Sequence, residues 1–193
     1  MDEIKLVCCM KAGDRQAFDR LYEAYKDTLL RMACLVSGSM DDAEDIVQET
    51  FVKCYLNIGS LREPAGFRSW LYQILYRTAY AYAKKKKREI PDEHAGIQAD
   101  DTNGITSLDY VLQSETQRMV HSAVHSLQFK QRAVVVLFYY NDLPVKEIAR
   151  ILGITEGTVK SRLFTARKKL GERLKQLAEG GGEYEKKSGI CSL

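Results

Sequence analysis

The sequence has little proline and no hydrophobic run long enough for a membrane-spanning protein. Its 193 residues contain three prolines, and the longest apolar run, Ala133 to Tyr140, is much too short to cross a bilayer. The N-terminus also lacks a basic region followed by an apolar cleavable stretch. We therefore expect a cytoplasmic protein that does not insert directly into a membrane.

Cysteine is present but without a metal-binding or redox pattern. The chain has five cysteines, and none forms a Cys-x-x-Cys pair of the kind that holds zinc or exchanges disulfides. Cys34 and Cys54 lie in apolar helical patterns, where a cysteine usually acts as a small buried hydrophobic residue. Reduced thiols fit a cytoplasmic chain.

The usual signatures of an enzyme are also missing. The sequence contains no phosphate-binding glycine loop and no nucleophile elbow. His121 and His125 have the spacing of a metal pair on a helix, but the metalloprotease motif needs Glu after the first His, where this chain has Ser122. We expect a protein without catalytic residues, metal, cofactor or small-molecule substrate.

Charge is unevenly distributed, although the formal net charge is only +3. The net charge is −4 over 1–60, +6 over 61–90, −5 over 91–126 and +6 over 127–193. Two basic segments separated by an acidic one suggest two contacts on the same nucleic acid. A solvated charged surface is the alternative.

Helical spacing of apolar residues runs through most of the chain, and strand alternation is absent. In the first half it predicts helices at about 4–11, 15–37, 41–57 and 64–88. The segment 91–107 is polar, acidic and aperiodic, so it predicts a flexible linker, and 179–193 predicts a polar disordered tail. The expected fold is all-α, with two small helical domains at 1–90 and 108–178 joined by the linker.

The most informative stretch of the second domain is Val145–Leu170, which has the order helix, glycine turn, helix. Gly153 can adopt the left-handed conformation that ends the first helix, and Thr155 can cap the second. Val159 and Leu163 lead an inward apolar stripe. This pattern predicts a helix-turn-helix whose polar face enters a DNA major groove, with an ordinary amphipathic hairpin as the alternative. The candidate DNA-binding residues are Thr155, Thr158, Lys160, Ser161, Arg162, Phe164, Thr165 and Arg167.

An acidic helix is expected at about 41–57 in the first domain. Ala43 and Phe51 would face the core, while acidic and apolar residues share the other side. Acidic residues at a helix start also favour the helix dipole, but this does not explain Glu49 or an exposed Val52. The pattern indicates a docking surface for a basic partner, formed by Asp42, Asp45, Gln48, Glu49 and Val52.

The next helix interleaves aromatic and basic residues and ends in the run 84–88. Trp70, Leu71 and Leu75 belong to its expected inner stripe. Its other side offers rings for unstacked bases and cations for phosphates, as single-stranded DNA requires. The candidate residues are Arg68, Tyr72, Gln73, Tyr76, Arg77, Tyr80, Lys84 and Lys85, with the tyrosines expected to be exposed.

These motifs resemble bacterial sigma factors of the extracytoplasmic-function (ECF) type, in the sigma-70 family. The string Gly157–Leu163 is similar to the recognition helix that binds the minus-thirty-five element, and Asp42–Phe51 is similar to the helix that grips the clamp coiled coil of the polymerase's largest subunit. The resemblance covers about 14–88 and 108–177, and departs at Gln128 and Thr165, where relatives carry proline and arginine.

The resemblance implies a sigma factor that recruits core RNA polymerase, through its clamp and flap, to specific promoters. It assigns the helix over 67–88 and the loop before it to the minus-ten element, where the strands part without ATP, and it implies an anti-sigma protein as a further partner. A helix-turn-helix repressor or a response-regulator output domain is the rival interpretation of 145–170. The acidic helix at 41–57 argues against both, because neither needs it.

Overall fold

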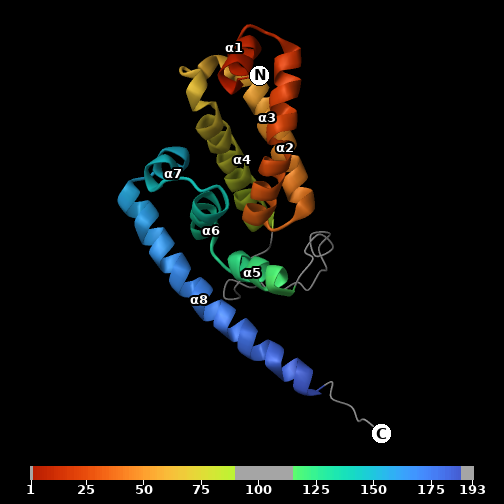
Figure 1. The fold of residues 1–193 in the computed structure, drawn as a ribbon, viewed down its shortest axis with the longest axis vertical. Helices are drawn as coiled ribbons and strands as arrows, with labels where there is room; N and C mark the ends of the chain where they lie inside the picture. The colour runs from red at the N-terminus through yellow and green to blue at the C-terminus, as the bar shows by residue number, and fades with distance from the viewer. Residues whose placement is uncertain (1, 90–114, 188–193) are drawn as a thin grey trace.

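The computed structural model describes residues 2–89 and 115–187, and these ranges contain helices and turns but no strand (Figure 1). The predicted linker at 91–107 lies outside the described residues, as do the first residues of the expected second domain. The all-α prediction is confirmed for the part of the chain that is described.

The first helical unit contains four helices and two short 3₁₀ turns. The helices are α1 (Glu3–Lys11), α2 (Arg15–Ser37), α3 (Met40–Asn57) and α4 (Phe67–Glu89), and the turns are η1 (Ile58–Ser60) and η2 (Pro64–Gly66). The predicted helix from 64 therefore begins later, at Phe67. Proline and glycine in η2 suit a tight turn at a helix start.

Side-chain caps begin two of these helices. The Asp14 carboxylate accepts hydrogen bonds from the backbone N–H groups of Gln16 and Ala17, at 2.8 and 3.3 Å. The Ser39 hydroxyl accepts one from the N–H of Asp42, at 3.3 Å. Each cap satisfies backbone donors that have no partner within the helix.

The first core forms where apolar faces of α2, α3 and α4 meet. Leu29, Ile46 and Leu71 are completely or almost completely removed from solvent. The predicted burial of Cys34 and Cys54 is confirmed, and burial raises the pKa of these thiols to about 11 and about 12. Both therefore remain protonated and pack as small hydrophobic side chains.

The second unit contains α5 (Glu115–His125), α6 (Phe129–Val135), a π-helical turn η4 (Val136–Tyr140), α7 (Val145–Leu152) and α8 (Glu156–Lys187). The helix α8 extends through 179–187, the first part of the expected tail, and ends at Lys187. Glycines at 180–182 lower helix propensity without forbidding a helix, and no proline follows to stop it. Residues 188–193 lie outside the described residues.

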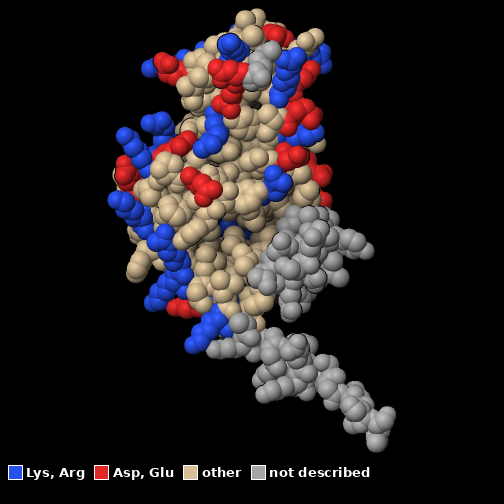
Figure 2. Space-filling model, viewed as in Figure 1, with Lys and Arg blue, Asp and Glu red and all other residues tan. Residues whose placement is uncertain are grey.

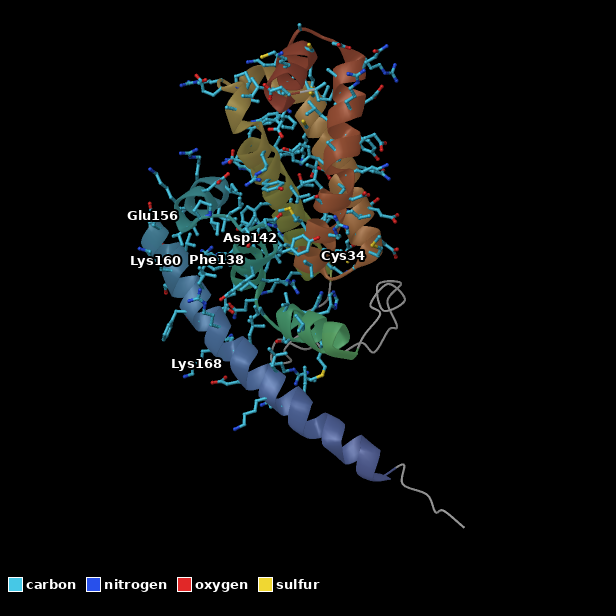
Figure 3. The ribbon with its side chains drawn as sticks, in the orientation of Figure 1. Cys34, Phe138, Asp142, Glu156, Lys160 and Lys168 are labelled. Carbon is cyan, nitrogen blue, oxygen red and sulfur yellow. The ribbon has the colours of Figure 1, made fainter. Side chains whose placement is uncertain are left out.

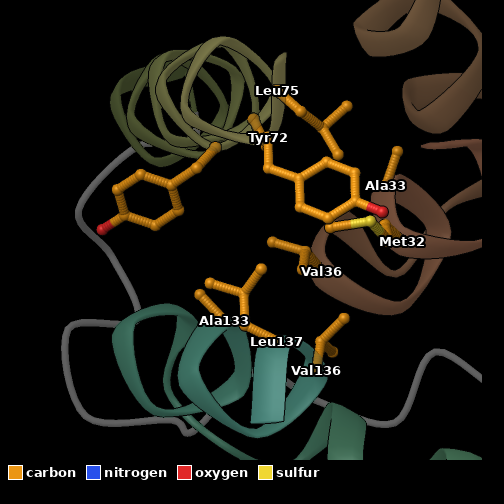
Figure 4. Close-up of a pocket in the computed structure, with 10 residues that line it drawn as sticks. Met32, Ala33, Val36, Tyr72, Leu75, Ala133, Val136 and Leu137 are labelled. Atoms are coloured by element: carbon orange, nitrogen blue, oxygen red, sulfur yellow. The ribbon is translucent and has the colours of Figure 1, made fainter. Parts of the chain in front are cut away.

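The two units pack against each other and share one hydrophobic core. Figure 4 shows the junction, where Met32 and Val36 of α2, Tyr72 of α4, and Ala133 and Leu137 of the second unit line a common apolar cavity. The sequence makes no prediction of this arrangement. Apolar periodicity shows that a helix face is buried, but it does not show which partner buries it.

A second junction joins the C-terminal end of α2 to α5. Gly38 ends α2 with φ +85°, and a Cβ placed there would lie 1.4 Å from Nε2 of His125. Burial lowers the pKa of His125 to about 4, and the Coulombic interactions with Arg132, His121 and Lys86 act in the same direction. The imidazole is therefore neutral near pH 7 and lies directly against the glycine backbone.

We expect Gly38→Ala to destabilise the protein more than Gly13→Ala, although both glycines have positive φ. Gly13 has φ +91° and open space around the added methyl group, so its loss should be the backbone strain alone, about 1–2 kcal/mol. At Gly38 the methyl group must also displace His125, which adds about 1–3 kcal/mol. Chemical denaturation of both variants measures the difference. Equal losses of stability in the two variants would show that the contact with His125 adds nothing to the effect of Gly38→Ala.

Candidate functional site

The helix-turn-helix forms as predicted from its turn residues. Gly153 has φ +64°, and the N–H of Ile154 reaches the carbonyl of Ala149 at 3.0 Å, which closes the end of α7. The Thr155 hydroxyl accepts from the N–H of Thr158 at 3.2 Å and caps α8. The turn therefore fixes the angle at which α8 leaves α7.

The apolar side of α8 is anchored and its polar side is presented to solvent. Val159, Leu163 and Ala166 are buried, as expected from their spacing. Of the candidate DNA-binding residues, Thr158 and Arg162 are half-buried, and the exposed ones are Thr155, Lys160, Ser161, Phe164, Thr165 and Arg167. Figure 3 shows Lys160 near the start of α8 and Lys168 further along it. This face combines cations, hydroxyls and one exposed ring.

Arg167 is held by the π-helical turn. Its Nε donates a hydrogen bond to the Tyr139 hydroxyl at 2.7 Å, and its guanidinium carbon lies 5.6 Å from the ring centre of Phe138 and 5.7 Å from that of Tyr139. The sequence did not single out Tyr139, because it lies far from Arg167 along the chain. The contact uses Nε and not the two terminal nitrogens, which form the fork by which arginine binds anions.

The face of α4 is divided between solvent and the second unit. Arg68, Arg77, Lys84 and Lys85 are exposed. Gln73 donates to the carbonyl of Arg150 at 3.4 Å. The predicted exposure of Tyr72 is wrong: only 4% of it is accessible, because α2 and the second unit enclose its ring. Tyr72 therefore belongs to the core.

Tyr76 and Tyr80 are present on α4 as a stacked pair, with ring centres 6.3 Å apart and planes inclined by 22°. Tyr76 is half-buried and Tyr80 is exposed. Burial raises the pKa of Tyr76 and the nearby Arg162 opposes this rise, so α8 also lies close to Tyr76.

The acidic side of α3 is accessible along its length. Asp45, Gln48 and Val52 are exposed, and Val52 reaches 57%. Glu49 pairs with Lys53 at 2.6 Å, and Asp42 pairs with Lys86 of α4 at 2.9 Å. Pairs this exposed contribute little to stability and can exchange partners.

Two further apolar residues extend this surface and were not among those predicted. Tyr55 is 48% exposed and Leu56 is 73% exposed, and both follow Val52 at the three- and four-residue spacing of one helix face. That spacing could have identified them. The candidate docking surface, defined here as Asp42, Asp45, Gln48, Glu49, Val52, Tyr55 and Leu56, is therefore acidic at one end and apolar at the other.

Basic side chains gather along one edge of the second unit, although both units carry charges of both signs on this face. Figure 2 shows lysine and arginine side chains along the left edge, over α7 and the first part of α8. Within 2–89 and 115–187, no cluster of three His, Cys, Asp or Glu residues could hold a metal ion. The same ranges contain no helix both long and apolar enough for a bilayer.

Comparison with known proteins shows the family to which the chain belongs. The model of the family described as "Sigma-70 region 2" matches residues 21–89, and that of "Sigma-70, region 4" matches residues 117–170. The ECF RNA polymerase sigma factor SigW of Bacillus subtilis is 32% identical over 179 residues, which cover 87% of this chain and 94% of SigW. The chain belongs to the ECF sigma factors.

Other relatives agree with this assignment. The ECF sigma factor SigM of Mycobacterium tuberculosis is 33% identical, over 92% of this chain and 87% of its own length. Among solved structures, the sigma factor RpoE of Bartonella quintana, in complex with the anti-sigma factor NepR, aligns with a TM-score of 0.65 and 26% identity, over 82% of this chain and 96% of RpoE. The rival interpretation as a repressor or response regulator is wrong, because region 2 matches as well as region 4.

Proposed function

We propose that this sigma factor binds core RNA polymerase through the docking surface on α3 and directs it to promoters through α8 and α4. The observation that carries this proposal is the presence, in one ECF sigma chain, of an exposed acidic and apolar face and a separate exposed cationic recognition face. The acidic face suits a basic coiled coil, and the cationic face suits DNA. Each surface has a different partner.

The proposed function does not require the chain itself to catalyse a reaction. Separating promoter strands requires a few kcal/mol per extruded base, and binding energy can supply this without nucleotide hydrolysis. We therefore assign a non-enzymatic role, exercised in the cytoplasm where the polymerase acts. An anti-sigma protein is proposed as the regulatory partner, supported by the complex of the similar RpoE with NepR.

Two assays test this proposal together. The purified chain should retain core RNA polymerase in a pull-down. The assembled holoenzyme should start transcription at promoters where core enzyme alone does not initiate. A chain that binds duplex DNA tightly by itself and fails to retain core enzyme would contradict the proposal.

Tyr139→Phe should weaken binding of the holoenzyme to duplex containing the minus-thirty-five element by about 0.5–1.5 kcal/mol, the usual contribution of one hydrogen bond. The ring and its contact with the guanidinium remain, so only the orientation of Arg167 is lost. Binding should be measured in a double-mutant cycle with Arg167→Ala, as a function of salt concentration. In the Arg167→Ala background, Tyr139→Phe should have no effect. An equal loss in both backgrounds would exclude a role through Arg167.

A further inference from the structure

The segment between α3 and α4 lies at the same end of the first unit as α1 (Figure 1). It covers residues 58–66, and we call it the α4 loop. It consists of the turns η1 and η2 and a short extended stretch between them. Its exposed side chains include Ser60, Arg62 and Glu63. The loop leads directly into the helix that is proposed to contact the minus-ten element.

The α4 loop is anchored to the body of the first unit at Leu61. The side chain of Leu61 is only 6% exposed, whereas its neighbours Ser60 and Arg62 are exposed. The N–H of Leu61 donates to the carbonyl of Ile58 at 3.1 Å and closes η1. The carbonyl of Leu61 accepts a hydrogen bond at 2.6 Å from Nζ of Lys11, the last residue of α1. Because the donor is charged, this hydrogen bond is a strong connection between α1 and the loop.

A second set of contacts joins α1 to the start of α4. The Tyr25 hydroxyl donates to the Glu3 carboxylate at 2.5 Å. The Tyr25 ring lies edge-on to the ring of Phe67, with ring centres 5.7 Å apart. Phe67 is the first residue of α4 and is 1% exposed. The helix α1 therefore supports the α4 loop at two points, near its middle through Lys11 and at its end through Glu3 and Tyr25.

A fixed loop conformation favours the binding of DNA. A surface loop with few contacts samples several backbone conformations, and the entropy lost when binding selects one of them lowers the affinity. A loop already held in the bound conformation avoids this loss. Lys11 can act in this way without touching DNA, because its hydrogen bond is to the loop backbone.

We propose that Lys11 is a positioning residue for promoter DNA, which holds the α4 loop in the conformation that receives the minus-ten strand. This inference rests on the proposed role of α4. Exposed loop residues on either side of Leu61 contact the strand, and Lys11 contacts the loop. The match to sigma-70 region 2 begins at residue 21, so Lys11 and the whole of α1 lie outside it.

Three substitutions separate positioning from a general effect of charge. Lys11→Met removes the ammonium group and keeps an unbranched side chain, so the Leu61 carbonyl loses its donor. Lys11→Arg keeps a charged donor at the same place and should retain most of the wild-type affinity for DNA. Lys5→Met is the matched control, since it makes the same change at an exposed position earlier on α1.

Two measurements follow the loop and its binding to DNA. Hydrogen exchange of the full-length chain, measured by mass spectrometry, should be faster in Lys11→Met over 57–67 and unchanged in the rest of the first unit. Fluorescence anisotropy of the holoenzyme with a labelled single-stranded minus-ten oligonucleotide should show weaker binding. If the loop of the variant is in the binding conformation in about one tenth of molecules, the expected loss is about tenfold. The salt dependence should not change, because a positioning residue makes no phosphate contact.

The outcomes separate positioning from a general structural role and from a direct contact. Unchanged exchange, or unchanged oligonucleotide affinity, in Lys11→Met would overturn the inference. Faster exchange throughout the first unit, a smaller salt dependence, or an equal loss of affinity in Lys5→Met or Lys11→Arg would also overturn it. A wild-type holoenzyme that does not bind the oligonucleotide would instead contradict the proposed role of α4. Faster exchange confined to the loop, with weaker binding at unchanged salt dependence, would support the inference.

Discussion

Replacing Asp45 and Glu49 together by arginine is expected to abolish binding of core RNA polymerase while leaving the helices intact. Both residues lie on the accessible side of α3, and the apolar residues Val52, Tyr55 and Leu56 continue that side. Reversing two charges in a complementary interface replaces attraction by repulsion, which costs several kcal/mol in binding. A loss of 100-fold or more in affinity is therefore expected, as about 1.4 kcal/mol corresponds to a factor of ten.

The fold should tolerate this change. Glu49 pairs with Lys53 on the same helix, and exposed pairs at this spacing contribute only about 0.3–0.5 kcal/mol. The matched control is Glu23→Arg with Asp27→Arg, which makes the same change in charge at the same spacing on the exposed side of α2. Pull-down and circular dichroism of both double variants give the comparison. Normal retention of core enzyme by the α3 variant would show that this face is not the binding site for the polymerase.

Lys160→Ala and Arg162→Ala should each weaken holoenzyme binding to duplex containing the minus-thirty-five element by about 1–3 kcal/mol if the side chain reaches a base edge. Lys160 is exposed on α8, whereas Arg162 is half-buried and lies near Tyr76 of α4. The two changes together are expected to reduce specific transcription strongly.

Binding at several salt concentrations, on cognate and altered duplexes, distinguishes the two kinds of contact. Loss of a base contact relaxes the preference at one position, while loss of a phosphate contact weakens binding to every sequence and lowers the salt dependence. Lys5→Ala is the control, since Lys5 is exposed on α1, outside both proposed DNA surfaces. Normal transcription from a cognate promoter by both variants would mean that α8 is not the recognition helix.

The sequence by itself determined the features that depend on near neighbours in the chain. The caps at Asp14, Ser39 and Thr155 and the left-handed turn at Gly153 need only the right residue beside a helix. Helical spacing also identified the buried stripe of α8 and the accessible face of α3, because a surface helix has one buried side. The motifs on these faces were sufficient for the family.

Only the tertiary structure decided the features that depend on distant segments. Tyr72 is buried because α4 is covered on one side by α2 and on another by the second unit, and periodicity assumes a single covered side. The pairing of Tyr139 with Arg167 joins residues of η4 and α8. Phe129 meets Tyr76 and Tyr80 across a junction for which the sequence has no local signal. Local chemistry fixes each helix and its faces, but which faces meet depends on how all the buried surfaces fit together.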